Sequence, residues 1–209
     1  MIRPVRALLL VSGAYIAAQM LADIASLRII SVAGWAVDAG TLVYPITFTL
    51  RDLIHKVGGI EAARFIILSA ALINLAMAAF LWLVSVLPPD LATGLQPEFG
   101  QVLSPVWRIV FASIAAEVVA ELIDTEVYRR WVLAFGEKRQ WGRVLVSNGF
   151  AVPIDSVLFV LLAFAGVLGT GVILEVLAVN VVLKLAVTLL TIPLIYTVRH
   201  RPVGEDVRI

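Results

Sequence analysis

Residues 107–128 read WRIVFASIAAEVVAELIDTEVY, a stretch long and apolar enough to cross a bilayer as one helix. Inside or beside its apolar part stand Arg108, Glu117, Glu121 and Asp124. A charge in hydrocarbon costs roughly 2.5–3.5 kcal/mol on insertion scales. Groups this costly persist where they pair inside a helix bundle or line a polar path. The stretch therefore predicts a membrane protein whose helices enclose a polar site.

The composition of the whole chain supports this class. Of 209 residues, 61% are hydrophobic and 15% are charged, and the mean hydropathy is +1.01. A net charge of +1 argues against nucleic-acid binding, which needs a concentrated basic surface. With no cysteine and two histidines, the chain has no disulfide frame, thiol nucleophile or ordinary zinc site. We therefore expect neither a metal nor a cofactor.

Apolar runs of suitable length predict six transmembrane helices. The candidate segments are 5–30, 40–55, 62–87, 106–128, 147–167 and 171–198. The second segment is short and contains Pro45, so we expect that helix to be tilted or broken. The predicted fold is an all-α integral membrane protein, a compact bundle of six transmembrane helices. Residues 1–209 are expected to form a single transporter domain.

Basic residues set the expected orientation. The connections 31–39, 88–104 and 167–171 contain no lysine or arginine, whereas the opposite connections and both ends of the chain are basic. Because cytoplasmic loops carry the excess of lysine and arginine, both termini should be cytoplasmic. The expected location is the cell membrane, crossed several times, with lipid around the bundle.

Polar residues recur at helical spacing, so they form stripes along single helix faces. The stripes are Ser113, Glu117, Glu121 and Asp124; Asn180, Lys184, Thr188 and Thr191; Asn148 and Asp155; and Ser12, Tyr15, Gln19 and Ser26, with Asp23 beside them. We expect the four stripes to converge on one cavity, with Lys184 facing the acids of residues 106–128. The alternative is that these groups only pair to hold the bundle together.

Four motifs occur in a characteristic order. They are YPITFTLRDLIHKVGGIEAARF at 44–65, the stretch at 107–128, RVLVSNGFAVPIDSVLFVLLAF at 143–164 and VVLKLAVTLLTIPLIY at 181–196. In this order they resemble the queuosine precursor transporters of the VUT type, a family of six-span membrane proteins. The resemblance covers nearly the whole chain.

The resemblance implies uptake of a 7-deazaguanine, either the 7-cyano or the 7-aminomethyl compound, for tRNA modification. The candidate substrate-binding residues are Tyr44, Phe48, Asp52, Arg108, Glu117, Asn148, Asp155 and Lys184. A carboxylate, from Asp155 or Glu117, suits the N1–H and 2-amino donors of a guanine-like base. Lys184, Asn148 or Arg108 suits its acceptor edge. An aromatic ring from Tyr44, Phe48 or Trp107 would stack on the flat base.

Other functions remain open from the sequence. One is the substrate-binding subunit of an energy-coupling-factor vitamin transporter, which would need a separate ATPase because this chain has no Walker-type loop. An intramembrane hydrolase would lack a recognisable catalytic motif, so we do not expect an enzyme. A channel would carry flux without saturation. Proton coupling, homo-oligomer formation and the choice between cyano and aminomethyl substrates are not decided by the sequence.

Overall fold

The computed structural model of the protein describes residues 4–90, 92, 94–135 and 140–191. Within the helices, some side chains lie outside this description: Pro4, Asp52, His55, Lys56, Ile60, Glu121, Asp124, Thr125, Tyr128, Arg129, Val132, Gln140, Trp141, Arg143, Val144 and Thr191. The expectations for the two termini, for residues 192–198 and for the side chains of Asp52, Glu121 and Asp124 therefore lie outside the described residues.

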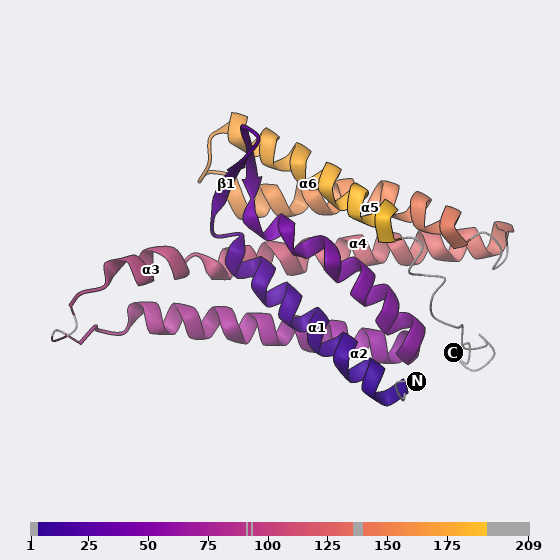
Figure 1. Cartoon of the computed structure of the whole chain (residues 1–209), viewed down its shortest axis with the longest axis horizontal. Coiled ribbons are helices and arrows are strands. Elements are labelled where there is room, and N and C mark those ends of the chain that lie inside the picture. The colour runs from indigo at the N-terminus through magenta and orange to yellow at the C-terminus, as the bar shows by residue number, and fades with distance from the viewer. Residues whose placement is uncertain (1–3, 91, 93, 136–139, 192–209) are drawn as a thin grey trace.

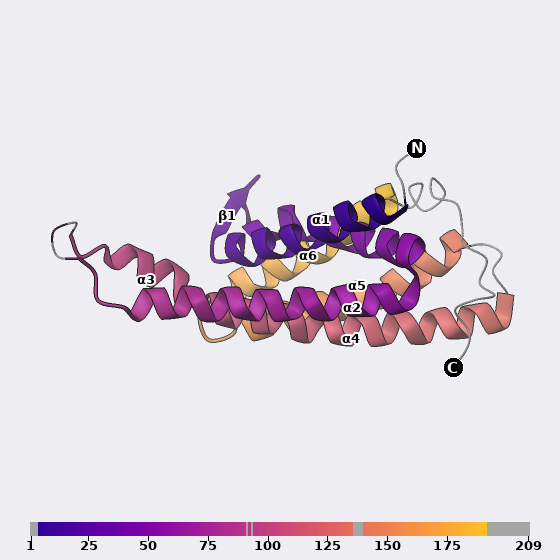
Figure 2. The same cartoon turned by 90° about the horizontal axis from the view of Figure 1, so that it is seen from below.

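The described chain is mainly helical and forms an elongated bundle (Figures 1 and 2). Its elements, in chain order, are α1 (Pro4–Ala25), β1 (Ile29–Val32), β2 (Trp35–Asp38), the 3₁₀ helix η1 (Ala39–Leu42), α2 (Tyr44–Val86), α3 (Pro97–Leu103), α4 (Val106–Phe135), α5 (Gln140–Phe164) and α6 (Thr170–Thr191). An all-helical membrane protein was expected, and the helices confirm that part of the prediction.

Helix α2 is broken at Gly59, where the backbone adopts φ 82° and ψ 177°. This positive φ is accessible to glycine at little steric cost. The halves before and after Gly59 run in opposite directions along the bundle (Figures 1 and 2). Pro45, in contrast, lies in the first turn of α2, where its missing N–H costs no helical hydrogen bond. The break expected within 40–55 is therefore not found there, and the kink at Gly59 lies between the predicted segments 40–55 and 62–87.

The connection after the first helix is a β-hairpin. The predicted first segment extended to Ile30, whereas α1 ends at Ala25 and Ile29–Val32 pairs antiparallel with Trp35–Asp38. Ala33 and Gly34 form the two-residue turn, with φ 53° and 85°. Two positive φ values are the mark of a type I′ hairpin turn. Apolar β-branched residues in this region raised its hydropathy, so the strand was mistaken for the end of a helix.

Among the described residues, five segments are long and apolar enough to cross a membrane: Val5–Ala25, Glu61–Val86, Pro97–Ala120, Leu145–Phe164 and Thr170–Leu190. Exposed side chains on the second of these, such as Phe65, Leu68 and Leu72, suit contact with lipid. The chain is therefore a multi-pass membrane protein. The expected crossing at 40–55 is not among the five, so the count of six stays a prediction.

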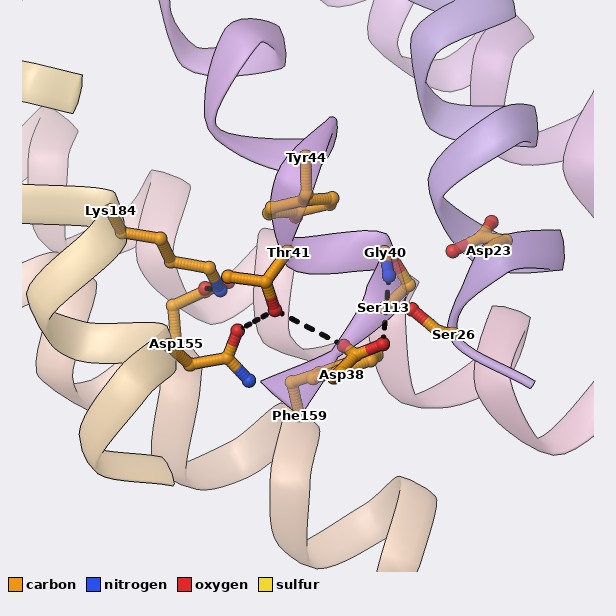
Figure 3. Close-up of a pocket in the computed structure, with 11 residues that line it drawn as sticks. Asp23, Ser26, Asp38, Gly40, Thr41, Tyr44, Ser113, Asp155, Phe159 and Lys184 are labelled. Atoms are coloured by element: carbon orange, nitrogen blue, oxygen red, sulfur yellow. Dashed lines mark hydrogen bonds and ion pairs between the residues drawn. The ribbon is translucent and has the colours of Figure 1, made fainter. Parts of the chain in front are cut away.

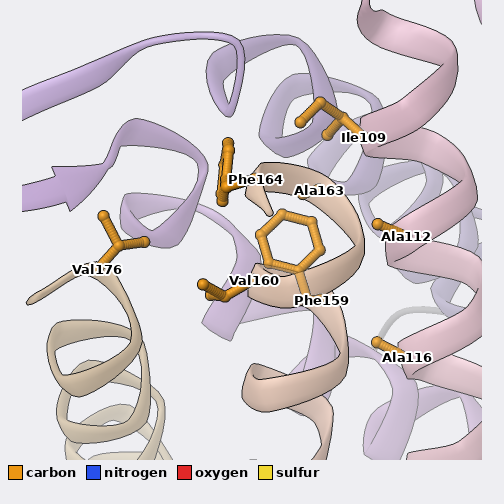
Figure 4. Close-up of a cluster of buried hydrophobic side chains, with 8 residues drawn as sticks. All are labelled: Ile109, Ala112, Ala116, Phe159, Val160, Ala163, Phe164 and Val176. Carbon is orange, nitrogen blue, oxygen red and sulfur yellow. The ribbon is translucent and has the colours of Figure 1, made fainter. Parts of the chain in front are cut away.

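The largest apolar cluster lies between α4, α5 and α6 (Figure 4). Ala112 and Ala116 on α4 are four residues apart and fully buried. Small residues at this spacing let two membrane helices approach closely. Phe159 and Phe164 of α5 pack edge to face, with ring centroids 5.9 Å apart. This cluster fixes the relative positions of the helices that carry the polar residues described next.

Candidate functional site

A buried polar pocket lies where the hairpin and η1 meet the helices (Figure 3). It encloses about 270 Å³ of empty space, including its opening. Its lining residues are Asp23, Ser26, Asp38, Gly40, Thr41, Tyr44, Ser113, Asp155, Phe159, Asn180 and Lys184. We call it the upper pocket. Each of the four predicted polar stripes contributes to this pocket, but two members expected in the same cavity, Tyr15 and Glu117, line a second pocket described below.

Lys184 and Asp155 form a buried ion pair in the upper pocket. The distance from Lys184 Nζ to Asp155 Oδ2 is 2.5 Å, and the two side chains are 3% and 1% exposed. The ammonium also lies 4.7 Å from the ring centroid of Tyr44. We had expected Lys184 to face the acids of residues 106–128. It pairs with Asp155 because consecutive helices α5 and α6 pack together and bring these two positions face to face.

Two polar atoms of this pocket have no hydrogen-bond partner. They are Asp155 Oδ1 and Asn180 Nδ2, and each residue is 1% exposed. The other atom of the Asn180 amide, Oδ1, accepts a hydrogen bond from the Thr41 hydroxyl. A buried polar atom left unpaired costs about 1–3 kcal/mol. The upper pocket therefore presents one acceptor and one donor that a ligand can satisfy.

The hairpin side of the upper pocket is built by Asp38. Its carboxylate accepts a hydrogen bond from the Gly40 N–H at 2.9 Å and so caps η1, and the Thr41 hydroxyl oxygen lies 3.4 Å from its Oδ2. Burial raises the pKa of Asp38, while the Gly40 hydrogen bond acts in the opposite direction. Gly40 is needed here because a Cβ would lie 2.5 Å from the carbonyl oxygen of Ala22. The glycine lets η1 approach α1.

A second pocket, the lower pocket, adjoins the first. Its empty space, including the opening to solvent, is about 210 Å³, and it is lined by Tyr15, Tyr44, Thr47, Phe48, Arg51, Glu117 and Ala120. Glu117 accepts hydrogen bonds from the Tyr15 hydroxyl and from Gln19 Nε2, the latter at 3.1 and 3.0 Å to its two oxygens. Tyr44 lines both pockets, so one side chain borders both the pocket with the ion pair and the pocket with the Glu117 carboxylate.

The remaining predicted site residues lie elsewhere. Arg108 donates to the carbonyl oxygens of Leu162 and Ala165, at 2.8 and 2.5 Å, and so caps the end of α5. Asn148 is half-buried on α5 and lines neither of the two pockets. The Asp52 side chain lies outside the described residues.

Of the aromatic residues considered for stacking, some line a pocket and one does not. Phe48 lines the lower pocket, with the Arg51 guanidinium carbon 5.4 Å from its ring centroid. Trp107 is 55% exposed and lines neither pocket. Of the three rings considered for stacking, only Tyr44 reaches the upper pocket, where Phe159 adds a second ring.

Sequence reasoning did not select several residues that the structure brings to the upper pocket. Asp38 was assigned to an outer connection, yet it is 2% exposed. Asn180 and Asp23 stood in or beside polar stripes without being chosen as site residues. The available signal was the Asp-Ala-Gly-Thr sequence at 38–41, an acid followed by a glycine and a hydroxyl residue, which suits a capped turn.

Apolar helices that enclose a small buried site with an ion pair define a class, the polytopic membrane transporters. The family model described as "Putative vitamin uptake transporter" matches residues 38–198, and the chain belongs to that family. No curated protein and no solved structure matches the chain. The match confirms the resemblance drawn from the motifs. It makes the chain a transport protein for a small molecule, and not an enzyme.

Proposed function

We propose that the protein imports a 7-deazaguanine base, the 7-cyano or 7-aminomethyl precursor of queuosine or archaeosine, for tRNA modification. The observation that carries the proposal is that one oxygen of the Asp155 carboxylate is paired and the other is not. Oδ2 binds Lys184, whereas Oδ1 is buried without a partner in the upper pocket. The N1–H and 2-amino groups of a guanine-like base are donors that suit this acceptor. The unpaired Asn180 Nδ2 suits the O6 acceptor of the same base.

The other walls of the upper pocket also suit a flat base. Tyr44 and Phe159 supply two aromatic rings. Stacking on such a ring contributes roughly 1–3 kcal/mol per base.

The route across the membrane follows from the break in α2. We propose that residues 44–58 form the sixth crossing, which runs opposite to the second half of α2. Helix α1 begins and α6 ends at the same end of the bundle, which agrees with an even number of crossings (Figure 2). That end would face the cytoplasm of the cell membrane. The upper pocket then lies closer to the outer end, where the hairpin lies.

The proposal is tested by uptake of labelled 7-cyano- and 7-aminomethyl-7-deazaguanine into proteoliposomes that contain only this protein. We expect saturable uptake of at least one compound. Asp155→Asn should abolish uptake because the amide offers Lys184 no charge and offers the base a weaker acceptor. The matched control is Asp90→Asn, the same chemical change in an exposed loop, which should leave uptake intact.

Failure of well-folded wild-type protein to take up either base would refute the proposal. Because the matching family is described in terms of vitamins, the same assay includes competition by unlabelled water-soluble vitamins. Inhibition by a vitamin and not by guanine would favour a vitamin carrier. If that carrier also required added ATPase subunits, the protein would be the substrate-binding subunit of an energy-coupling-factor transporter. Uptake is also measured with and without an inward proton gradient, and faster uptake with the gradient would indicate proton coupling.

A further inference from the structure

The upper pocket contains more acid than base. Three carboxylates line it, those of Asp23, Asp38 and Asp155, against one ammonium, that of Lys184. Lys184 lies 2.5 Å from Asp155, so these two charges balance. Asp23 and Asp38 are 3% and 2% exposed, and no second cation appears among the described residues that line the pocket. Two carboxyl groups therefore face the pocket without a counter-charge of their own.

Independent evidence for a ligand comes from the unpaired atoms of the same pocket. Asp155 Oδ1 and Asn180 Nδ2 belong to residues that are 1% exposed, and neither atom has a hydrogen-bond partner. They point to an occupant with donors on one edge and an acceptor nearby. Burial raises the pKa of Asp38, although its hydrogen bonds and the charge of Lys184 act in the opposite direction.

A metal ion is a poor candidate for the missing positive charge. Among the described residues, no three aspartate, glutamate, histidine or cysteine side chains come together closely enough to hold one. Asp23, at the α1 side, and Lys184, at the α6 side, lie across the pocket from each other (Figure 3). Acids spread along a pocket suit an organic cation whose charge and hydrogen-bond donors are separated in space.

We propose that the upper pocket selects a cationic base, the 7-aminomethyl-7-deazaguanine, over the neutral 7-cyano compound. This inference rests on the proposed function. The N1–H and 2-amino edge of the base binds Asp155 Oδ1. The substituent at C7 points away from that edge, toward Asp38 and Asp23, which bind its primary ammonium. The nitrile has no hydrogen to donate and no charge, so it gives neither carboxyl group a cation.

The proposal is tested by the affinities of the two compounds for purified protein in lipid nanodiscs, measured by isothermal titration calorimetry. The wild-type protein should bind the aminomethyl compound at least about tenfold more tightly, because charge-assisted hydrogen bonds are roughly twice as strong as neutral ones. Asp38→Asn keeps an oxygen that can cap Gly40, and Asp23→Asn keeps the side-chain shape. Each should reduce the preference by about tenfold while changing nitrile affinity little.

The matched control is Glu98→Gln, which removes one acid from the exposed first turn of α3 and should leave both affinities unchanged. Equal or tighter binding of the nitrile by the wild-type protein would overturn the inference and leave the proposed function standing. Failure of folded protein to bind either compound would overturn both. A preference that persists in both aspartate variants would place the ammonium elsewhere and also overturn the inference. If Asp38→Asn fails to fold, the inference is still tested by the ratio of the two affinities in the wild-type protein and in Asp23→Asn.

Discussion

Replacement of Lys184 by methionine should destabilise the protein far more than replacement of both members of its ion pair. At 2.5 Å and an effective dielectric of 20, the attraction between Nζ and Oδ2 is about 7 kcal/mol before solvation is counted. Removing both charges from water costs several kcal/mol per ion, which offsets most of that attraction. The intact pair is therefore close to neutral for stability.

Lys184→Met retains the length of the side chain but leaves the Asp155 carboxylate buried and without its cation. Breaking a buried pair in this way typically costs about 3–5 kcal/mol. In the double variant Asp155→Asn with Lys184→Met, the uncompensated charge is gone, so most of this cost should disappear. Uptake should stay absent in the double variant because the acceptor for the base is also lost.

The assay is thermal unfolding in detergent, followed by intrinsic tryptophan fluorescence, together with uptake by the same preparations. The expected order of stability is wild type, then the double variant, then Lys184→Met. If Lys184→Met were as stable as the wild type, the Asp155 carboxylate would not depend on Lys184 for a buried counter-charge. That result would contradict the distance and exposure of the pair. If the double variant regained uptake, Asp155 would not be a ligand of the base.

The remaining predictions concern single contacts. Ala33→Asn should raise stability by about 1 kcal/mol, because asparagine tolerates the left-handed conformation that costs alanine energy; an unchanged melting temperature would argue against the type I′ turn. Gly40→Ala should lower stability by about 1–3 kcal/mol and impair uptake through its clash with Ala22, whereas Gly13→Ala, with nothing within 4 Å of its Cβ, should not. Arg108→Gln should lower the melting temperature and leave the KM for uptake unchanged, since Arg108 caps α5; a raised KM would return it to the substrate site.

The long helices were predictable because their apolar length is a property of the sequence alone. Segments 62–87, 106–128 and 147–167 correspond to helices whose bounds differ from the prediction mainly at the ends. The hairpin was not predicted, since four-residue strands of isoleucine and valine carry the same hydropathy as the end of a helix. A break near Pro45, within 40–55, was expected and is absent, because that proline lies in the first turn of α2. The kink at Gly59 falls between the predicted segments 40–55 and 62–87, and its left-handed backbone conformation is one that hydropathy does not report.

The candidate site was predictable in part for a similar reason. Helical spacing identified Asp155 and Lys184 as inward-facing, because costly groups in apolar segments must be buried and paired. Spacing within one helix does not reveal which groups of different helices meet, so the partner of Lys184 was assigned wrongly. Asp38 and Thr41 lie in a short hairpin and 3₁₀ turn, and only the folded chain brings them beside Asn180.

The two pockets do not act as independent sites, because Tyr44 belongs to both. On one side its ring lies 4.7 Å from the Lys184 ammonium, and on the other it forms a wall of the pocket that holds Glu117. Substitutions that share a contact are not additive, and their coupling is commonly about 0.5–3 kcal/mol. We therefore expect Asp155→Asn and Glu117→Gln to be coupled in their effects on ligand affinity, and Tyr44→Leu to remove that coupling. Additive effects in the presence of Tyr44 would show that the lower pocket serves the architecture of the bundle and not the transported ligand.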